Sequence, residues 1–271
     1  MHPVTHYFKA LESLQSLRGF LQDDTVFRFA ALPLADIDPP IAPAVLWNAA
    51  GEIESRGGIV RPLALVAAAV FARRGDIGEG ITAQARHTVA VRDMIGAWGQ
   101  AGGATAFALA LATGDDDWPL AAWHATGNAE PEAIAAATEA AFRGLGALKF
   151  GRVNATQLAA QILALAPVPE RLNRFGLLLG ALRDRKQKWA LMDAVAVAHL
   201  SLLPDPPAEL ARELALRTDA QLQGPDPPAR MTATSLAALM VSRERSRDRD
   251  LEDFLTLRIA ALVAAWRELG E

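Results

Sequence analysis

Cysteine is absent from the 271-residue chain. This excludes disulfide bonds, thiolate catalysis, iron–sulfur clusters and zinc sites with Cys ligands, and it suits a reducing compartment. Long hydrophobic runs are also lacking. The most apolar stretch, residues 62–72, is about half the ~20 residues that a membrane-spanning helix needs. No basic region followed by an apolar stretch opens the sequence, so no signal peptide is visible and a cytoplasmic location is expected.

Neither sign of charge is in large excess, with 27 Lys and Arg against 31 Asp and Glu and a formal net charge of −4. No dense Lys/Arg block appears either. We therefore expect no binding to nucleic acid or to an anionic membrane surface. Hydrophobic residues make up 51% of the chain, which indicates a sizeable core rather than a disordered polypeptide.

Strand patterns are missing as well. No segment sustains polar and apolar alternation, and no Asn-Gly or Asp-Gly turn lies between apolar runs. Apolar residues instead recur at spacings of three and four, as in the N-terminal series Phe8, Leu11, Leu14, Leu17 and Leu21. The sequence therefore predicts an all-α protein.

An imperfect internal repeat runs through the chain. Ala- and Leu-rich segments end at helix breakers and alternate with segments that carry charge; these Ala-rich segments are residues 61–74, 104–112, 155–166 and 190–203. Alanine on a helix face lets neighbouring backbones approach closely, while larger apolar residues fill the remaining gaps. The pattern predicts an α-solenoid-like or curled array of antiparallel helix pairs, with Ala-rich inner helices and solvated outer helices such as the one containing Arg171, Arg174 and Arg183.

The predicted organisation is a single helical domain over residues 1–271. Residues 1–57 form N-terminal helices and a Pro-rich linker, residues 58–224 form the helix-pair array, and residues 225–271 form C-terminal capping helices. The last segment carries a strong amphipathic pattern, Leu251, Leu255, Ile259, Leu262 and Trp266. Such a helix would cover the open end of the array.

A short phrase in the middle of the chain resembles a known family. Leu-Lys-Phe-Gly at 148–151 and Asn-Ala-Thr-Gln-Leu at 154–158, leading to Leu-Ala-Leu at 163–165, resemble an uncharacterised bacterial all-helical family of unknown function. The resemblance covers residues 60–205 at the level of pattern. It implies a bacterial helical protein and brings no assigned activity.

One acidic cluster is a candidate metal site: Asp115, Asp116, Asp117 and the nearby His124. Three carboxylates and an imidazole could bind a hard cation. The spacing, however, lacks the alternating positions and the distal Glu of a calcium loop. The sequence favours the alternative, a solvated helix-capping loop held to the core by Trp118 and Trp123.

The histidines offer no recognisable catalytic or zinc motif. His2 and His6 stand four apart with no third ligand nearby, and His87 is predicted to lie at the surface. His199 lies in an Ala-rich inner segment and is predicted to be a satisfied core histidine. The glycine-rich stretches 75–80 and 99–103 lack the Lys-Ser/Thr of a phosphate-binding loop. We predict no catalytic residue and no cofactor.

The densest charge run is a candidate partner-binding site formed by Arg243, Arg245, Arg247 and Arg249. These arginines could contact phosphates or an acidic partner. Glu244, Asp248 and Asp250 nearly neutralise them, which favours a solvated helix face with local ion pairs worth a few tenths of a kcal/mol.

These patterns favour a non-catalytic helical scaffold that binds a protein or peptide partner, because repeat arrays present extended surfaces. Two alternatives stay open. One is an enzyme or metal-dependent site near Asp115–Asp117 and His124. The other is a binder of a small apolar ligand between helix layers. The sequence makes no prediction of oligomeric state.

Overall fold

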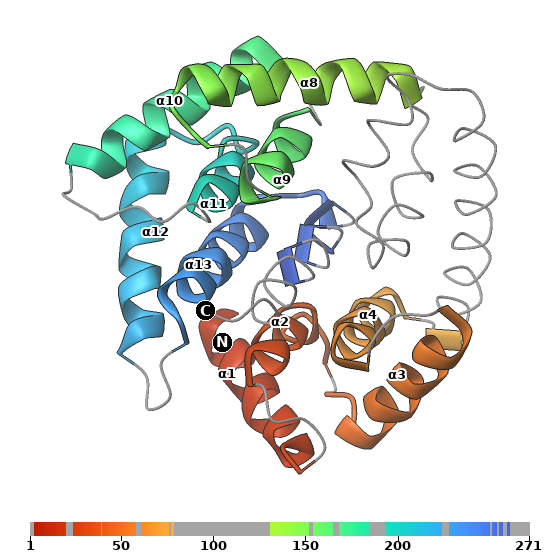
Figure 1. The fold of residues 1–271 in the computed structure, drawn as a ribbon. Coiled ribbons are helices and arrows are strands. Elements are labelled where there is room, and N and C mark those ends of the chain that lie inside the picture. The colour runs from red at the N-terminus through yellow and green to blue at the C-terminus, as the bar shows by residue number, and fades with distance from the viewer. Residues whose placement is uncertain are drawn as a thin grey trace. The chain divides into compact units, whose positions relative to one another are not determined.

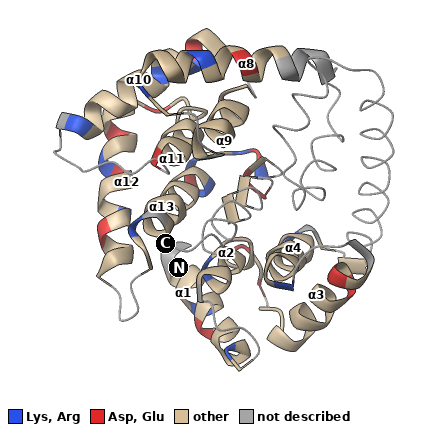
Figure 2. Ribbon diagram, in the orientation of Figure 1, with Lys and Arg blue, Asp and Glu red and all other residues tan. Residues whose placement is uncertain are grey.

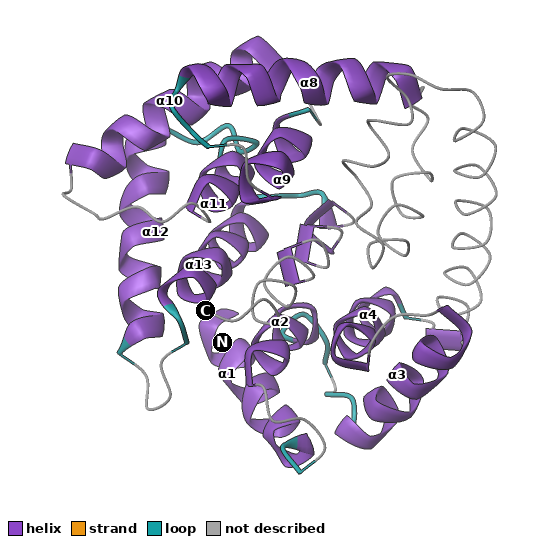
Figure 3. Ribbon diagram, in the orientation of Figure 1, coloured by secondary structure: helices purple, strands orange, loops and turns teal. Residues whose placement is uncertain are grey.

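The computed structural model describes residues 3–19, 24–38, 40–57, 61–75, 77–78, 131–151, 154–164, 168–184, 193–223, 228–249, 251–253, 255–256 and 259–260. Within these ranges the regular elements are all helices and no strand occurs (Figure 3). The prediction of an all-α protein is confirmed. No helix in this part of the chain has the length and apolar character that a membrane crossing requires.

The helices follow one another along the chain as labelled in Figure 1. They are α1 (Pro3–Leu14), the short 3-10 helix η1 (Gln15–Leu17), α2 (Asp24–Leu34), α3 (Pro43–Gly57), α4 (Arg61–Arg74), α8 (Pro131–Ala147), α9 (Asn154–Leu163), α10 (Val168–Asp184), α11 (Asp193–Leu200), α12 (Pro207–Leu222) and α13 (Arg230–Arg245). Further helical residues follow Asp248.

Packing divides the chain into two compact units. Among the described residues, unit 1 comprises those from 3 to 78 and from 253 to 260, and unit 2 comprises those from 131 to 252. The predicted array, residues 58–224, supplies helices to both units. The grouping of the whole chain into one domain stays a prediction, as does its curled or solenoid-like arrangement.

Helix α4 forms the centre of unit 1. It packs against α2 and α3, and α1 packs against α2. Every residue from Ala64 to Ala72 is buried. Because most of these side chains are alanine or valine, two neighbouring helices can approach the α4 backbone closely.

The start of α4 is tied to α3 by Arg61. Its Nε atom donates to Glu54 Oε2 at 2.7 Å, and its guanidinium lies 4.9 Å from the centre of the Trp47 ring. Gly51 of α3 leaves room for this group, since a Cβ there would come within 3.3 Å of the Arg61 nitrogens. A short residue at 51 therefore allows the guanidinium to lie between α3 and α4.

Unit 2 consists of two rows of helices. The inner row is α9, α11 and α13, and the outer row is α8, α10 and α12; within each row every helix packs against the next. Each outer helix also packs against the inner helix that follows it in sequence. All eight residues of α11 are buried. The Ala-rich segments predicted at 155–166 and 190–203 overlap α9 and α11. Within α9, Ala155, Thr156 and every residue from Leu158 to Leu163 are buried, as expected for an inner helix.

Helix α13 is the third member of the inner row, although it lies in the region predicted to form capping helices. It packs against α11 and α12 and is buried from Thr232 to Arg243. Its composition explains this position, because the stretch Thr-Ala-Thr-Ser-Leu-Ala-Ala-Leu-Met-Val-Ser places small side chains on several faces.

Two glycines of α8 provide a direct test of the outer-row packing. A Cβ at Gly144 would collide with the side chain of Leu172 on α10, whereas a Cβ at Gly146 would meet no atom within 4 Å. We expect Gly144→Val to lower the free energy of unfolding by about 1–3 kcal/mol through overpacking. At the open position, Gly146→Ala should raise the free energy of unfolding by about 0.5 kcal/mol, because alanine favours helix over glycine. Urea unfolding followed by circular dichroism measures both values; a Gly144→Val protein as stable as the wild type would contradict the packing.

Candidate functional site

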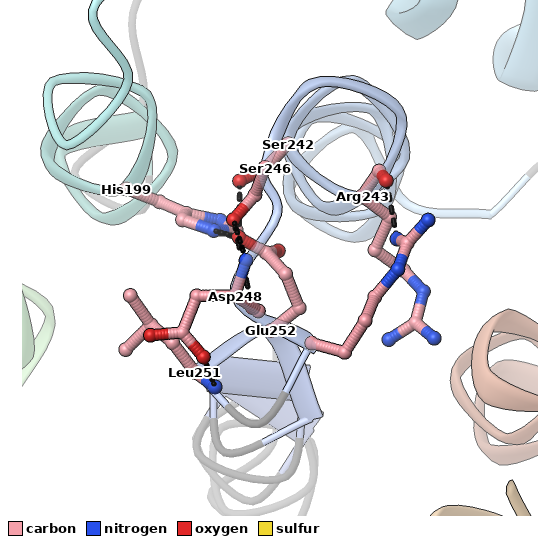
Figure 4. A network of polar contacts seen from close by, with 8 residues as sticks. His199, Ser242, Arg243, Ser246, Asp248, Leu251 and Glu252 are labelled. Atoms are coloured by element: carbon pink, nitrogen blue, oxygen red, sulfur yellow. Dashed lines mark hydrogen bonds and ion pairs between the residues drawn. The ribbon is translucent and has the colours of Figure 1, made fainter.

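Four polar side chains come together in the core of unit 2. They form the His199 network: His199 of α11, Ser242 and Arg243 of α13, and Glu252 (Figure 4). His199 Nε2 lies 3.2 Å from Glu252 Oε2. The Ser242 hydroxyl donates to Glu252 Oε1 at 2.6 Å. His199 is 0% exposed, and Ser242 and Glu252 are each 1% exposed. The network is thus a histidine, a serine and a carboxylate held together inside the unit.

A turn without glycine or proline brings Glu252 into this position. Ser246 is extended (φ −72°, ψ 142°) and ends α13. The backbone N–H of Asp248 donates to Ser246 Oγ at 3.1 Å, and Asp248 Oδ1 accepts from the backbone N–H of Leu251 at 3.0 Å. Asp248 is therefore the N-cap of a new helical segment, and Glu252 lies in its first turns. The charge run is accordingly split by a turn instead of continuing as one solvated helix face.

The Glu252 carboxylate is stabilised in its ionised form. Burial alone would raise its pKa, but the adjacent His199, the hydrogen bonds from His199 and Ser242, and the positive charge of Arg243 together hold the pKa below its usual value. Glu252 is therefore a carboxylate at neutral pH.

A carboxylate that accepts from one imidazole nitrogen leaves the other nitrogen for acid–base chemistry. Here Glu252 occupies Nε2, and Nδ1 of His199 has no hydrogen-bond partner among the described residues. The chemistry of the group is that of a general base with an orienting carboxylate. The ring itself is 0% exposed, so it has no contact with solvent in this structure. In this structure the network joins α11, α13 and the segment after Asp248.

The four arginines of the predicted partner site do not form one exposed patch. Arg243 is buried, and its carbonyl oxygen accepts from Arg249 Nη1. Arg245 forms an ion pair with Asp205, and Arg247 is exposed. Partner binding through these residues stays a prediction, but at least Arg243, Arg245 and Arg249 contribute to contacts within unit 2.

Two arginines predicted for the solvated layer instead bind the backbone of the segment that follows α11. Arg171 Nη1 donates to the carbonyl oxygens of Ser201 at 2.9 Å and Leu202 at 3.2 Å. Arg174 Nη2 donates to the carbonyl oxygen of Asp205 at 2.7 Å. These carbonyls belong to residues after Leu200, the last residue of α11, so the two arginines satisfy backbone acceptors of the connection to α12. Both side chains are half-buried as a result.

A second buried ion pair lies in unit 1. Arg73 Nε of α4 donates to Asp253 Oδ2 at 2.7 Å. The Asp253 side chain is 0% exposed and that of Arg73 is 15% exposed. This pair holds the residues that begin at 253 against α4.

The predicted metal site lies outside the described residues: this applies to Asp115, Asp116, Asp117 and His124 alike. His2 and His87 lie outside them too. Within the described ranges, no group of three or more His, Asp or Glu side chains could hold a metal ion. The acidic cluster stays a prediction of the sequence.

Sequence reasoning missed both buried carboxylates, Glu252 and Asp253, although a pattern marks them. They precede Leu255 and Thr256 by three residues, which places them on the same helix face as this buried pair. A carboxylate on a buried face requires a partner of opposite charge or a hydrogen-bond donor. That requirement predicts a partner without indicating which residue it is.

Comparison with known proteins provides no relative: no family model, curated protein or solved structure matches the chain. The function is therefore inferred from the described residues themselves.

Proposed function

We propose that the protein is a non-catalytic helical scaffold that binds a protein partner on the outer row of unit 2. The observation that carries this proposal concerns two adjacent outer helices. α10 and α12 pack against each other, and each presents one leucine that is more than half exposed, Leu177 at 54% and Leu216 at 59%. Exposed leucines on packed neighbours can anchor an apolar segment of a partner.

The surroundings of these leucines suit a protein interface. Exposed charged residues accompany them along the same helices, among them Arg183 on α10 and Arg212 on α12. Figure 2 shows charged positions along both helices. Protein interfaces commonly combine apolar anchors with a polar rim. A scaffold role also agrees with the burial of the His199 network, whose acid–base groups are enclosed by packing. We place this function in the cytoplasm, because a sequence without cysteine suits a reducing compartment.

A double variant, Leu177→Glu with Leu216→Glu, tests the proposal. Partners cross-linked to the immobilised chain in a bacterial lysate would be identified by mass spectrometry. For at least one partner of the wild type, we expect the captured amount to fall about tenfold or more in the double variant, because two charges replace the apolar anchors. The free energy of unfolding should change by only about 0.5 kcal/mol, since both side chains are exposed.

The matched control is Phe8→Glu, which places a charge on an exposed apolar position of α1 in unit 1. This variant should keep the partner. Equal capture by the wild type and the double variant would show that these leucines do not bind it.

A further inference from the structure

A pocket of about 310 Å³ opens in unit 1 between α1 and the segment that follows α2. This volume lies at the lower end of the range for small-molecule sites, about 300–1,000 Å³. Three polar residues of α1, His6, Lys9 and Ser13, line one wall. Asp38 and the apolar residues Ile37 and Ile41 belong to the segment after α2 and line the other wall, the one that this segment forms.

The wall formed by α1 offers hydrogen-bond donors. His6, Lys9 and Ser13 are spaced three and four residues apart, so their side chains lie on one helix face, and all three line the pocket. A lysine ammonium and a serine hydroxyl together suit a carboxylate ligand group.

The other wall has the complementary character. Asp38 is exposed and contributes a carboxylate, which favours a cationic ligand group such as an ammonium. Ile37 and Ile41 flank it and are half-buried, so they provide apolar surface beside the charge. The pocket therefore combines a cationic donor, an anionic acceptor and an apolar lining.

We infer that this pocket binds a small zwitterion of about six carbons with an apolar body. Its carboxylate would face Lys9 and Ser13, its ammonium would face Asp38, and its hydrocarbon part would lie against Ile37 and Ile41. A ligand with a carboxylate alone would place a negative charge near Asp38, and an amine alone would place a positive charge near Lys9. Each half-ligand therefore loses its attraction to one of these two residues and keeps a repulsion that nothing offsets. For this reason the zwitterion is preferred.

Titration calorimetry of the full chain near pH 7.5 with four probes tests this inference. The probes are L-leucine, whose charges are adjacent; 6-aminohexanoate, whose charges stand at opposite ends; and the half-ligands hexanoate and hexylamine. We expect at least one zwitterion to bind with a Kd of about 1 mM or tighter. The Kd of each half-ligand should be at least about tenfold higher. The stronger zwitterion identifies the separation of charges that the pocket prefers.

Two substitutions test which residue binds the carboxylate of the ligand and which binds its ammonium. Lys9→Gln should weaken the zwitterion and hexanoate alike. Asp38→Asn should weaken the zwitterion about fivefold or more and strengthen hexanoate, because the repelling carboxylate is gone. Glu12→Gln is the matched control, since Glu12 is an exposed carboxylate of α1 that does not line the pocket.

Three results would overturn the inference: no binding of either zwitterion at about 10 mM, half-ligands that bind as well as the zwitterions, or Asp38→Asn behaving like Glu12→Gln. The pocket lies in unit 1 and the proposed partner surface lies in unit 2. Failure of one proposal is therefore distinguishable from failure of the other.

Discussion

Glu252→Ala is expected to lower the free energy of unfolding by about 3–5 kcal/mol. The alanine removes the acceptor of the Ser242 hydroxyl and the partner of His199, and both side chains are buried. Arg243, also buried, loses a neighbouring negative charge. A buried donor without an acceptor loses its hydrogen bonds to water on folding and forms none within the protein. Urea unfolding monitored by circular dichroism gives the value.

Glu244→Ala is the matched control for this change. Glu244 also carries a carboxylate at the end of α13 and pairs with Arg217 at 2.8 Å, but it is exposed. Ion pairs in such positions contribute about 0–1 kcal/mol. If the two alanine variants were equally stable, the His199 network would not be a stabilising element of unit 2.

The effect of Glu252 should depend on pH in a defined direction. Its pKa in the folded protein is lower than usual, so its contribution to stability is fully present above the pKa of the unfolded chain. The contribution disappears as the pH falls through the folded-state pKa. The stability difference between the wild type and Glu252→Gln should therefore be largest near neutral pH and shrink below about pH 4. A difference that grew on acidification would have the wrong sign for a carboxylate with a lowered pKa.

Arg73→Ala should have an effect of similar size in unit 1, about 3 kcal/mol. The substitution leaves the Asp253 carboxylate at 0% exposure without its arginine partner. Removing both members of the pair by Arg73→Ala with Asp253→Ala should cost less than Arg73→Ala alone, because no buried charge is then left behind. Thermal and urea unfolding of the three proteins would establish this order.

An exposed ion pair provides the comparison for Arg73. Arg143 and Glu139 stand four residues apart on α8, and both are exposed. Arg143→Ala should change stability by about 0.5 kcal/mol or less. Equal losses for Arg73→Ala and Arg143→Ala would mean that burial of the Arg73–Asp253 pair has no energetic consequence.

The Ala-rich composition of three segments was enough to predict the helices that they form. The Ala-rich segment 61–74 coincides with α4, the segment 155–166 overlaps α9, and the segment 190–203 contains α11. The end of α13 was not anticipated, because no glycine or proline marks it. It depends on hydrogen bonds of the Ser246 and Asp248 side chains, which can equally lie within a helix.

The His199 network shows where local reasoning ends. An Ala-rich setting predicted a satisfied core histidine at 199. The structure buries the ring and pairs Nε2 with Glu252, whereas Nδ1 has no hydrogen-bond partner among the described residues. Its partner Glu252 lies 53 positions further along the chain. Composition and periodicity report on neighbours three or four residues away, so they indicate that a buried group needs a partner and cannot identify it. The same holds for Arg73 and Asp253.

The division of unit 1 into two stretches of sequence affects the order in which the protein can form during synthesis. Arg73 and Asp253 are separated by 180 positions, and the whole described part of unit 2 lies between them. At about 5–20 residues per second, a ribosome needs on the order of ten to forty seconds to deliver Asp253 after Arg73. During this interval the helices of unit 2 are synthesised, and Arg73 of α4 cannot yet pair with Asp253. Synthesis of unit 1 therefore begins before that of unit 2 and continues after it. A nascent chain that stops before residue 253 contains Arg73 without the buried carboxylate of Asp253.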